Sequence, residues 1–360
     1  MAIVLKVLIT GNLGYVGTVL SSYLKKKNHT IYGLDSGLFF DLKFDNLKPE
    51  IKSVDHQIYS DLRNLKNLDL QNIDAVIHLA AISNDPMGNE FENVTKEINF
   101  IATKKIIDLC VRKKVKKFVF ASSCSMYGNF DDEKIDLIDE KANLNPLTAY
   151  AKSKVKIEKF IEKISKKKTN HTLFTCLRFS TACGPSNRLR LDLVLNDFVA
   201  SAIVNKKIEL LSDGKAWRPL IDVRDMSRAF DWGINRKKIP KQEPMFVNIG
   251  NKKNNVLIKD LAHLVRKNFN NKVALKINSK NITDKRSYKV NFNKFYKYEN
   301  KKFYPKISIL KSINDTKNYL QKYNFSIKNF RNSNYIRLVY LKKLIANKVI
   351  NKKLYFNERF

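Results

Sequence analysis

The chain has 360 residues, of which 44% are hydrophobic, and a formal net charge of +34 at neutral pH. This length and apolar content suffice for one large or two modest hydrophobic cores. No apolar run reaches the roughly 18 residues of a membrane-spanning helix, which argues against a transmembrane protein and a membrane partner.

The positive charge is distributed unevenly. Residues 1–100 hold 10 Lys and Arg against 12 Asp and Glu, whereas residues 251–360 hold 28 against 5. In the later segment Lys is scattered among many Asn, which favours a compositional bias over a nucleic-acid surface. We therefore expect no nucleic-acid partner, although the charge would help to attract an anionic substrate.

The four cysteines show no CxxC pair and no metal-like spacing with His; they are Cys110, Cys124, Cys176 and Cys183. This pattern predicts a reduced, cytoplasmic protein without a metal site. The N-terminus MAIVLKVLITG is apolar but short, lacks a basic leader and runs into a glycine turn. We interpret it as a first strand and not as a signal peptide.

The first half of the chain alternates predicted strands and helices. Strands are predicted at 3–10, 30–35, 74–81, 116–123 and 173–180, several of them nearly all apolar, as strands buried on both faces are. One helix follows the first strand, and a second has an apolar side made of Ile98, Ile101, Ile106, Ile107 and Val111. This alternation predicts an α/β protein with a Rossmann-type, doubly wound parallel sheet.

After about residue 180 the pattern changes to a loop, a helix, and two strands around a turn at Asp213-Gly214 before the next helix. We predict a first domain over 1–180, rejoined by about 215–245. A smaller, partly interleaved C-terminal domain would comprise 181–214 and 246–330 and close over the sheet. The Lys-rich extension 331–360 is given no role.

The segment TGNLGYVG places glycines at 11, 14 and 17 between a predicted strand and a predicted helix. In this context Gly11 makes the tight turn, Gly14 lets the backbone approach a pyrophosphate at the helix N-terminus, and Gly17 lets helix and strand pack closely. The segment therefore predicts a dinucleotide site, with Tyr15 and Val16 at the phosphates.

An acidic residue ends the second predicted strand and bears on the choice of dinucleotide. The carboxylate of Asp35 would accept hydrogen bonds from the adenosine ribose and repel a 2′-phosphate, and Ser36 and Gly37 offer no Arg to hold one. The site therefore favours NAD over NADP. Asp61 is a candidate for the adenine amino group, and an ordinary loop aspartate is almost as good an interpretation.

A Tyr and a Lys four residues apart, Tyr150 and Lys154, share one face of a predicted helix. Oxidation of an alcohol needs a base for the hydroxyl proton, and a free Tyr, with a pKa of about 10, is a poor one. A Lys ammonium and the positive nicotinamide would lower that pKa. Ser123, at the carboxyl end of a buried strand, would hydrogen-bond the same substrate oxygen.

These motifs together resemble an extended short-chain dehydrogenase/reductase, of the NAD-dependent sugar-nucleotide epimerase/dehydratase family. The matching pieces cover about four-fifths of the chain and are TGNLGYVG, Asp35, HLAA (78–81), Asn99, SSCSMYG (122–128), YAKSK (150–154), LRFSTACGP (177–185), RPLIDVRD (218–225) and DKRSYKV (284–290).

The resemblance implies roles for individual residues. It makes Tyr150 the acid and base, Lys154 its partner and Ser123 the catalytic hydroxyl. Besides the glycine turn, Asp35 and Asp61, the resemblance implies that further residues contact NAD: Leu62, Leu79, Ala80, Ala81 and Asn99. It places at a nucleotide-diphosphate sugar Ser125, Thr181 and the diphosphate-binding Arg218 and Arg286, with Arg188 and Arg190 as further candidates. It also implies a homodimer formed through the helix of Tyr150.

The resemblance also constrains the reaction. A 4,6-dehydratase carries an acidic pair directly after the catalytic Ser or Thr, where this chain has Cys124 and Ser125. This favours a nucleotide-sugar 4-epimerase that acts through a transient 4-keto sugar in polysaccharide biosynthesis. A 4,6-dehydratase, a 3,5-epimerase and a reductase remain alternatives, and a non-catalytic NAD-binding scaffold is a remote one. Because neighbouring side chains on an extended segment alternate in direction, Cys124 is expected to pack inward.

Overall fold

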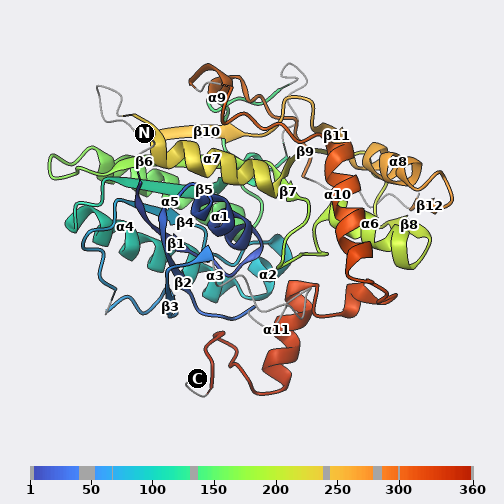
Figure 1. The fold of residues 1–360 in the computed structure, drawn as a ribbon, viewed down its shortest axis with the longest axis horizontal. Helices are drawn as coiled ribbons and strands as arrows, with labels where there is room; N and C mark the ends of the chain where they lie inside the picture. The colour runs from blue at the N-terminus through green and yellow to red at the C-terminus, as the bar shows by residue number, and fades with distance from the viewer. Residues whose placement is uncertain are drawn as a thin grey trace.

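The structure is a computed structural model of the chain and describes residues 4–39, 53–66, 68–129, 137–237, 244–278, 286–298 and 301–357. A sheet of seven parallel strands forms its centre, in the order β10-β6-β5-β4-β1-β2-β3 (Figure 1). Its strands are β1 (Lys6–Thr10), β2 (Thr30–Asp35), β3 (His56–Tyr59), β4 (Ala75–His78), β5 (Lys117–Ser123), β6 (Leu173–Phe179) and β10 (Met245–Ile249). The predicted α/β fold with a Rossmann-type sheet is confirmed.

Helices cover both faces of this sheet because successive strand residues point to opposite sides. On one face α1 (Tyr15–Lys25) and α7 (Val223–Asn235) pack on a core that includes Val7 and Ile9. On the other, α4 (Thr103–Arg112) and α5 (Ala149–Ser165) pack on a core that includes Leu8. The result is a three-layer arrangement (Figure 1).

One predicted helix face is partly wrong. Between α3 (Glu92–Lys96) and α4 the chain forms a π-helix, η2 (Glu97–Ala102). Its i→i+5 hydrogen bonds put an extra residue into the turn and rotate the side chains that follow. Ile106 and Ile107 are buried as predicted, but Ile101 is 41% exposed.

The second half of the chain adds two small sheets beside the central one. The first has the order β11-β9-β7 and contains β7 (Thr181–Cys183), β9 (Trp217–Asp222) and β11 (Asn255–Leu257). The second pairs β8 (Lys207–Leu210) with β12 (Ala274–Ile277). They share one core with α6 (Val194–Val204), α8 (Ile258–Asn268) and α10 (Ile309–Lys322), while the short α9 (Asn293–Tyr298) contacts β10. Gly214 has the positive φ, 70°, expected of the predicted turn.

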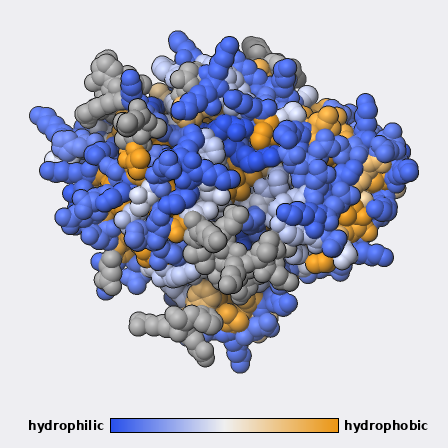
Figure 2. All heavy atoms as spheres, in the orientation of Figure 1, coloured by the Kyte–Doolittle hydropathy of each residue, from blue (hydrophilic) through white to orange (hydrophobic). Residues whose placement is uncertain are grey.

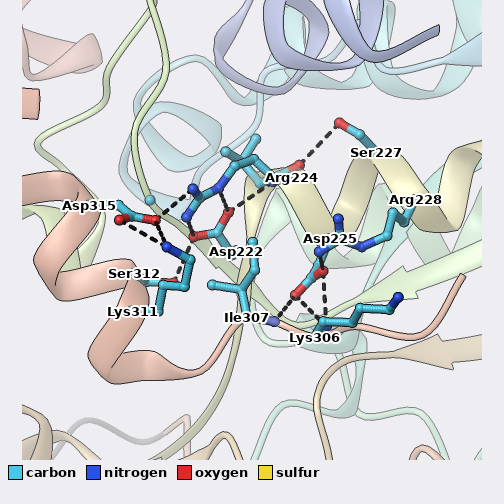
Figure 3. Close-up of polar contacts among 12 residues, drawn as sticks. Asp222, Arg224, Asp225, Ser227, Arg228, Lys306, Ile307, Lys311, Ser312 and Asp315 are labelled. Atoms are coloured by element: carbon cyan, nitrogen blue, oxygen red, sulfur yellow. Dashed lines mark hydrogen bonds and ion pairs between the residues drawn. The ribbon is translucent and has the colours of Figure 1, made fainter. Parts of the chain in front are cut away.

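A polar network ties α10 and the loop before it to the start of α7 (Figure 3). The buried Asp222 carboxylate caps α7 by accepting from the Arg224 backbone N–H at 3.0 Å, and it also accepts from Ser312 Oγ at 2.7 Å. Arg224 bridges Asp222 to Asp315. Asp225 accepts from the backbone N–H groups of Lys306 and Ile307. These bonds hold the two parts of the chain in one arrangement.

The C-terminal segment, residues 331–357, folds back toward the central sheet (Figure 1). It begins within a short 3-10 helix, η4 (Phe330–Asn332), and contains α11 (Arg337–Ala346), which contacts α2 (Asp85–Glu90). Apolar residues of the segment and of the chain after β4 form one buried cluster that includes Ile82, Met87, Val94, Leu341, Ile350 and Leu354. The extension left without a role is therefore packed against the Rossmann core.

The visible surface is mostly hydrophilic, and its apolar residues form small separate groups (Figure 2). Within the described ranges, no helix combines the length and the apolar character that crossing a bilayer requires. All four cysteines are buried and free.

Candidate active site

One cavity of about 970 Å³ lies at the carboxyl ends of the central strands. Apart from the further candidates Arg188 and Arg190, all but one of the predicted site residues line it: Gly11, Gly14, Tyr15, Val16, Gly17, Asp35, Asp61, Leu62, Leu79, Ala80, Ala81, Ser123, Ser125, Tyr150, Lys154, Thr181, Arg218 and Arg286. The exception is Asn99, which is buried and exchanges two hydrogen bonds with the backbone of Ile82, at 2.8 and 2.9 Å. Asn99 therefore shapes the cavity wall through the loop after β4.

The glycine turn packs so closely on neighbouring backbone that two of its glycines have no space for a side chain. Gly11 has φ +75°, and a Cβ there would lie 2.8 Å from Ala80 N. A Cβ on Gly17 would lie 2.2 Å from Gly11 O. Gly14 is the N-cap of α1 and offers no side-chain cap. The first N–H groups of α1 are thus left for an anion, and the turn fits the pyrophosphate of a dinucleotide.

Asp35 stands at the end of β2, where a ribose would lie. Its carboxylate accepts from Leu13 N at 3.1 Å and Gly37 N at 2.9 Å. Burial raises the pKa of Asp35, and these two bonds oppose the rise. The arrangement fits the hydroxyls of an adenosine ribose as further donors. Asp61 also lines the cavity, but both its oxygens already accept from the Arg63 guanidinium, at 2.9 and 2.7 Å.

Ser123, Tyr150 and Lys154 come together at the end of β5. Thr148 caps α5 by accepting from Ala151 N at 3.2 Å, and this fixes where the helix presents Tyr150. The Ser123 side chain lies near the Tyr150 hydroxyl and acts to lower its pKa. Lys154 Nζ lies 5.3 Å from the centre of the Tyr150 ring. The predicted pair and hydroxyl thus share one small volume.

The charges around Tyr150 differ from the expected ones. Burial raises the pKa of Tyr150 to about 12, the Ser123 side chain opposes this, and the nearby charges are Asp85, which raises the pKa, and Arg190, which lowers it. Burial also lowers the pKa of Lys154 to about 7. Lys154 is not among the groups that act on the pKa of Tyr150 in this structure.

Two arginines line the wall toward the second half of the chain. Arg218 and Arg286 both line the cavity, and the Arg218 guanidinium donates to the carbonyl oxygens of Trp217 and Arg286. Arg286 forms an ion pair with Asp85, which also accepts from Thr148 Oγ1 at 2.6 Å. Sequence reasoning missed Asp85, although the Asn-Asp-Pro string after β4 is a signal for a capped helix start, and Asn84 does cap α2.

Arg190 lines the cavity, whereas Arg188 does not. Arg190 donates twice to Asp192, each time at 2.9 Å, and once to Ser83 Oγ at 3.1 Å. Asn84 completes this group by donating to Asp192 at 2.6 Å. A buried arginine with its own carboxylate therefore faces the Tyr150 region.

Cys124 packs inward as expected, though for a different reason. Residues Cys124–Tyr127 form a 3-10 helix, η3, and not an extended segment. The Cys124 thiol donates to Arg178 O at 3.1 Å, and burial raises its pKa far above the usual range. Ser125 lines the cavity, and its hydroxyl has no hydrogen-bond partner among the described residues.

The C-terminal segment contributes residues that the sequence did not reveal. Arg331, Ile336 and Arg337 line the cavity, and the charge of Arg337 acts on Asp35. An Arg at the start of the apolar string LVYLKKLI resembles any surface residue of an amphipathic helix, so no sequence signal marks it. As for metals, the described part of the chain holds no cluster of three or more His, Cys, Asp or Glu suited to an ion.

Comparisons with known proteins agree with this geometry. Residues 7–250 match the NAD dependent epimerase/dehydratase family. Over 233 residues the chain is 30% identical to the "Uncharacterized UDP-glucose epimerase YtcB" of Bacillus subtilis (strain 168), covering 61% of this chain and 70% of that protein. It is 29% identical over 251 residues to the dTDP-D-glucose 4,6-dehydratase of Dictyostelium discoideum, covering 65% of this chain and 56% of that protein.

A solved structure described as MoeE5 in complex with UDP-glucuronic acid and NAD has the same fold, with a TM-score of 0.74. It is 22% identical and covers 88% of this chain and 99% of that one.

Proposed function

The chain belongs to the NAD-dependent epimerase/dehydratase family, an enzyme family, and from this premise we propose that it is a nucleotide-sugar 4-epimerase. One observation carries the choice of reaction. The two positions after Ser123, where a dehydratase would carry its acidic pair, hold a buried Cys124 turned away from the cavity and the neutral Ser125.

The other carboxylates near Tyr150 are held by arginines. Asp85 is paired with Arg286. Asp192 is paired with Arg190, and although burial opposes it, the arginine keeps the pKa of Asp192 below its usual value. Neither is placed as a protonated acid for the loss of a hydroxyl group. A proton shuttle through Tyr150 is therefore the chemistry that this site supports best.

In the proposed reaction the positive nicotinamide of bound NAD would lower the raised pKa of Tyr150, which then takes the proton of the sugar 4-hydroxyl and later returns it. Ser123, which lines the same cavity, would hold the same oxygen. Lys154 holds α5 against strand β5 at the site through its hydrogen bond to Ala121 O. When bound, NAD would supply the reversible hydride chemistry at C4 of the sugar, so that the hydride can return to the other face. The residues that would hold NAD are those of the glycine turn, Asp35 and the 79–81 wall.

The proposed substrate is a nucleotide-diphosphate sugar. Arg218 and Arg286 would bind its diphosphate, because guanidinium groups match phosphate oxygens. The relatives whose names mention UDP-glucose and UDP-glucuronic acid support a uridine nucleotide as the first candidate. Thr181 and Ser125 lie at the same cavity and would contact the sugar.

An isotope experiment tests the reaction. The protein, supplied with NAD, is incubated in heavy water with a panel of UDP-, GDP-, dTDP- and CDP-sugars, and products are read by mass spectrometry. A 4-epimerase gives an isomer of unchanged mass without deuterium. Loss of water would establish a 4,6-dehydratase instead. Deuterium gained without water loss would indicate a 3,5-epimerase. In a parallel incubation with NADH in place of NAD, stoichiometric consumption of NADH would indicate a reductase. A lack of reaction with every one of these sugars would contradict the proposed substrate class.

The wider organisation is also part of the proposal. We keep the division into an NAD-binding domain (1–180, rejoined at about 215–245) and a substrate domain (181–214 and 246–330). A homodimer through α5, a cytoplasmic location and the absence of a nucleic-acid partner complete it. Light scattering after size exclusion measures the dimer, and a lone monomer would contradict it.

A further inference from the structure

The C-terminal segment brings two arginines to the cavity wall, and only one is matched by a carboxylate. Arg331 donates to both oxygens of Asp197, at 2.8 and 2.6 Å. Arg337 has no ion pair within 4 Å to any carboxylate that the structure describes. Among the described residues, the fold therefore pairs Arg331 with a carboxylate and gives Arg337, six residues later, no such partner.

Arg337 is deeply buried, with 3% of its surface exposed. Its Nη2 donates to Arg188 O at 3.1 Å, and its guanidinium lies 4.6 Å from the centre of the Phe39 ring. Its Nη1 is buried and has no hydrogen-bond partner among the described residues. Burial lowers the pKa of Arg337 to about 9, and the positive charge of Arg190 acts in the same direction. Such a group is costly unless an anion joins it.

A chain of contacts places Arg337 across from the glycine turn. Ser186 Oγ donates to Tyr15 O at 2.7 Å and accepts from Arg188 N at 3.2 Å. Arg188 in turn presents its carbonyl oxygen to Arg337. On the other side, the charge of Arg337 acts on Asp35. Arg337 thus lies between the residue suited to the adenosine ribose and the turn suited to phosphates.

The backbone at this point adds to the attraction for an anion. α11 begins at Arg337, and its N-cap, Ile336, provides no side-chain cap. Both residues line the cavity. The first N–H groups of this ten-residue helix are therefore left at the cavity wall, as are those of α1 opposite.

We propose that Arg337 binds the pyrophosphate of the bound dinucleotide, so that the phosphates lie between the N-termini of α1 and α11. The C-terminal segment is then a working part of the cofactor site. On this proposal the cofactor's phosphates supply the anion that Arg337 lacks among the described residues.

Binding to the full chain tests this without any turnover assay. Calorimetry with NADH, NADPH and UDP as probes compares Arg337→Gln with the parent and with Lys343→Gln, which removes a charge from the exposed side of the same helix. A charge-assisted bond of this kind corresponds to a loss of about tenfold or more in NADH affinity. UDP affinity should not change, and Lys343→Gln should stay within about twofold for every probe because exposed charges are screened.

A melting curve separates binding from a structural role. The free Arg337→Gln variant should melt at the parent's temperature or above it, because it loses an unpaired buried charge. Saturating NADH should raise its melting temperature less than the parent's, and Arg337→Lys should recover part of the difference. Unchanged NADH affinity would overturn the proposal, as would a lowered melting temperature of the free variant. A loss confined to NADPH would assign Arg337 to a 2′-phosphate, and one confined to UDP would assign it to the substrate.

Discussion

Lys154 Nζ donates a hydrogen bond to Ala121 O at 2.7 Å, within strand β5, and lies 4.6 Å from the centre of the Phe120 ring. The lysine is thus fastened to the strand that ends in Ser123. This bond positions α5 against the sheet at the point where Tyr150 reaches the cavity. It explains how a charged side chain can be 4% exposed in the free chain.

The first prediction concerns Tyr150. Tyr150→Phe removes the hydroxyl that carries the proton, and the rate on the sugar identified by the isotope experiment should fall by roughly 10²–10⁴-fold. The ring remains to pack against α2, so NADH affinity and melting temperature should stay near those of the parent. Steady-state kinetics and NADH titration measure both. Full activity of this variant would remove Tyr150 from its role.

The second prediction concerns Lys154 and pH. Burial lowers its pKa from 10.5 to about 7, so the unfolded chain binds more protons than the folded chain between about pH 7 and 10.5. This site therefore makes stability rise with pH across that window. Lys154→Met should be more stable than the parent at pH 7, by at most about 4 kcal/mol, and the difference should vanish near pH 10.5.

Urea unfolding of the free chain at several pH values provides the measurement. Lys152→Met, on the exposed side of α5, is the matched control and should differ from the parent by less than about 0.5 kcal/mol at every pH. A difference for Lys154→Met that does not depend on pH would contradict the prediction.

The third prediction concerns a buried ion pair between α5, the helix that carries Tyr150, and strand β6. Glu158, 4% exposed, accepts from Arg178 Nη2 at 2.7 Å and from Ser122 Oγ at 2.6 Å. Glu158→Gln leaves the buried arginine charge unbalanced and should cost about 3–5 kcal/mol of unfolding free energy. Glu162→Gln breaks an exposed pair with Lys166 on the same helix and should cost under about 0.5 kcal/mol. Equal effects in urea unfolding would disprove the burial argument.

The fourth prediction separates two glycines of one turn. A Cβ on Gly17 would meet backbone atoms of Gly11 and Asn12 at 2.2 and 2.6 Å, whereas one on Gly14 would lie 3.2 Å from Gly11 O. Gly17→Ala should therefore lose about 1–3 kcal/mol of stability, and Gly14→Ala less. Gly14→Ala should instead weaken NADH binding, because its methyl group would lie where the phosphates approach. Melting curves and NADH titrations measure the two effects, and the reverse order would refute this account.

The central strands were predictable because a strand buried on both faces must be apolar along its length. β1, β2, β4, β5 and β6 begin and end within three residues of the predicted runs. β3, with the sequence HQIY, has no fully buried residue and carries no such signal. The burial of Ile101 was predicted wrongly because a straight helical period does not anticipate the π-helix at Glu97–Ala102.

The cavity-lining residues were predictable where short motifs place them at strand ends, as with Gly11, Ser123 and Tyr150. The charges that act on them were not. Asp85 and Arg190 reach Tyr150 from two other segments, and the pKa of Lys154 depends on its desolvation. Electrostatics of this kind depends on distance and burial, and neither is encoded in local spacing.

The local order of residues was thus enough to establish a parallel α/β sheet, the glycine turn and the Ser, Tyr and Lys of the candidate site, because each depends on patterns within a few residues. The position of Arg337 required the fold. It arises from packing of the last part of the chain on residues near 85 and near 188, and long-range packing of apolar surface leaves no periodic trace in sequence.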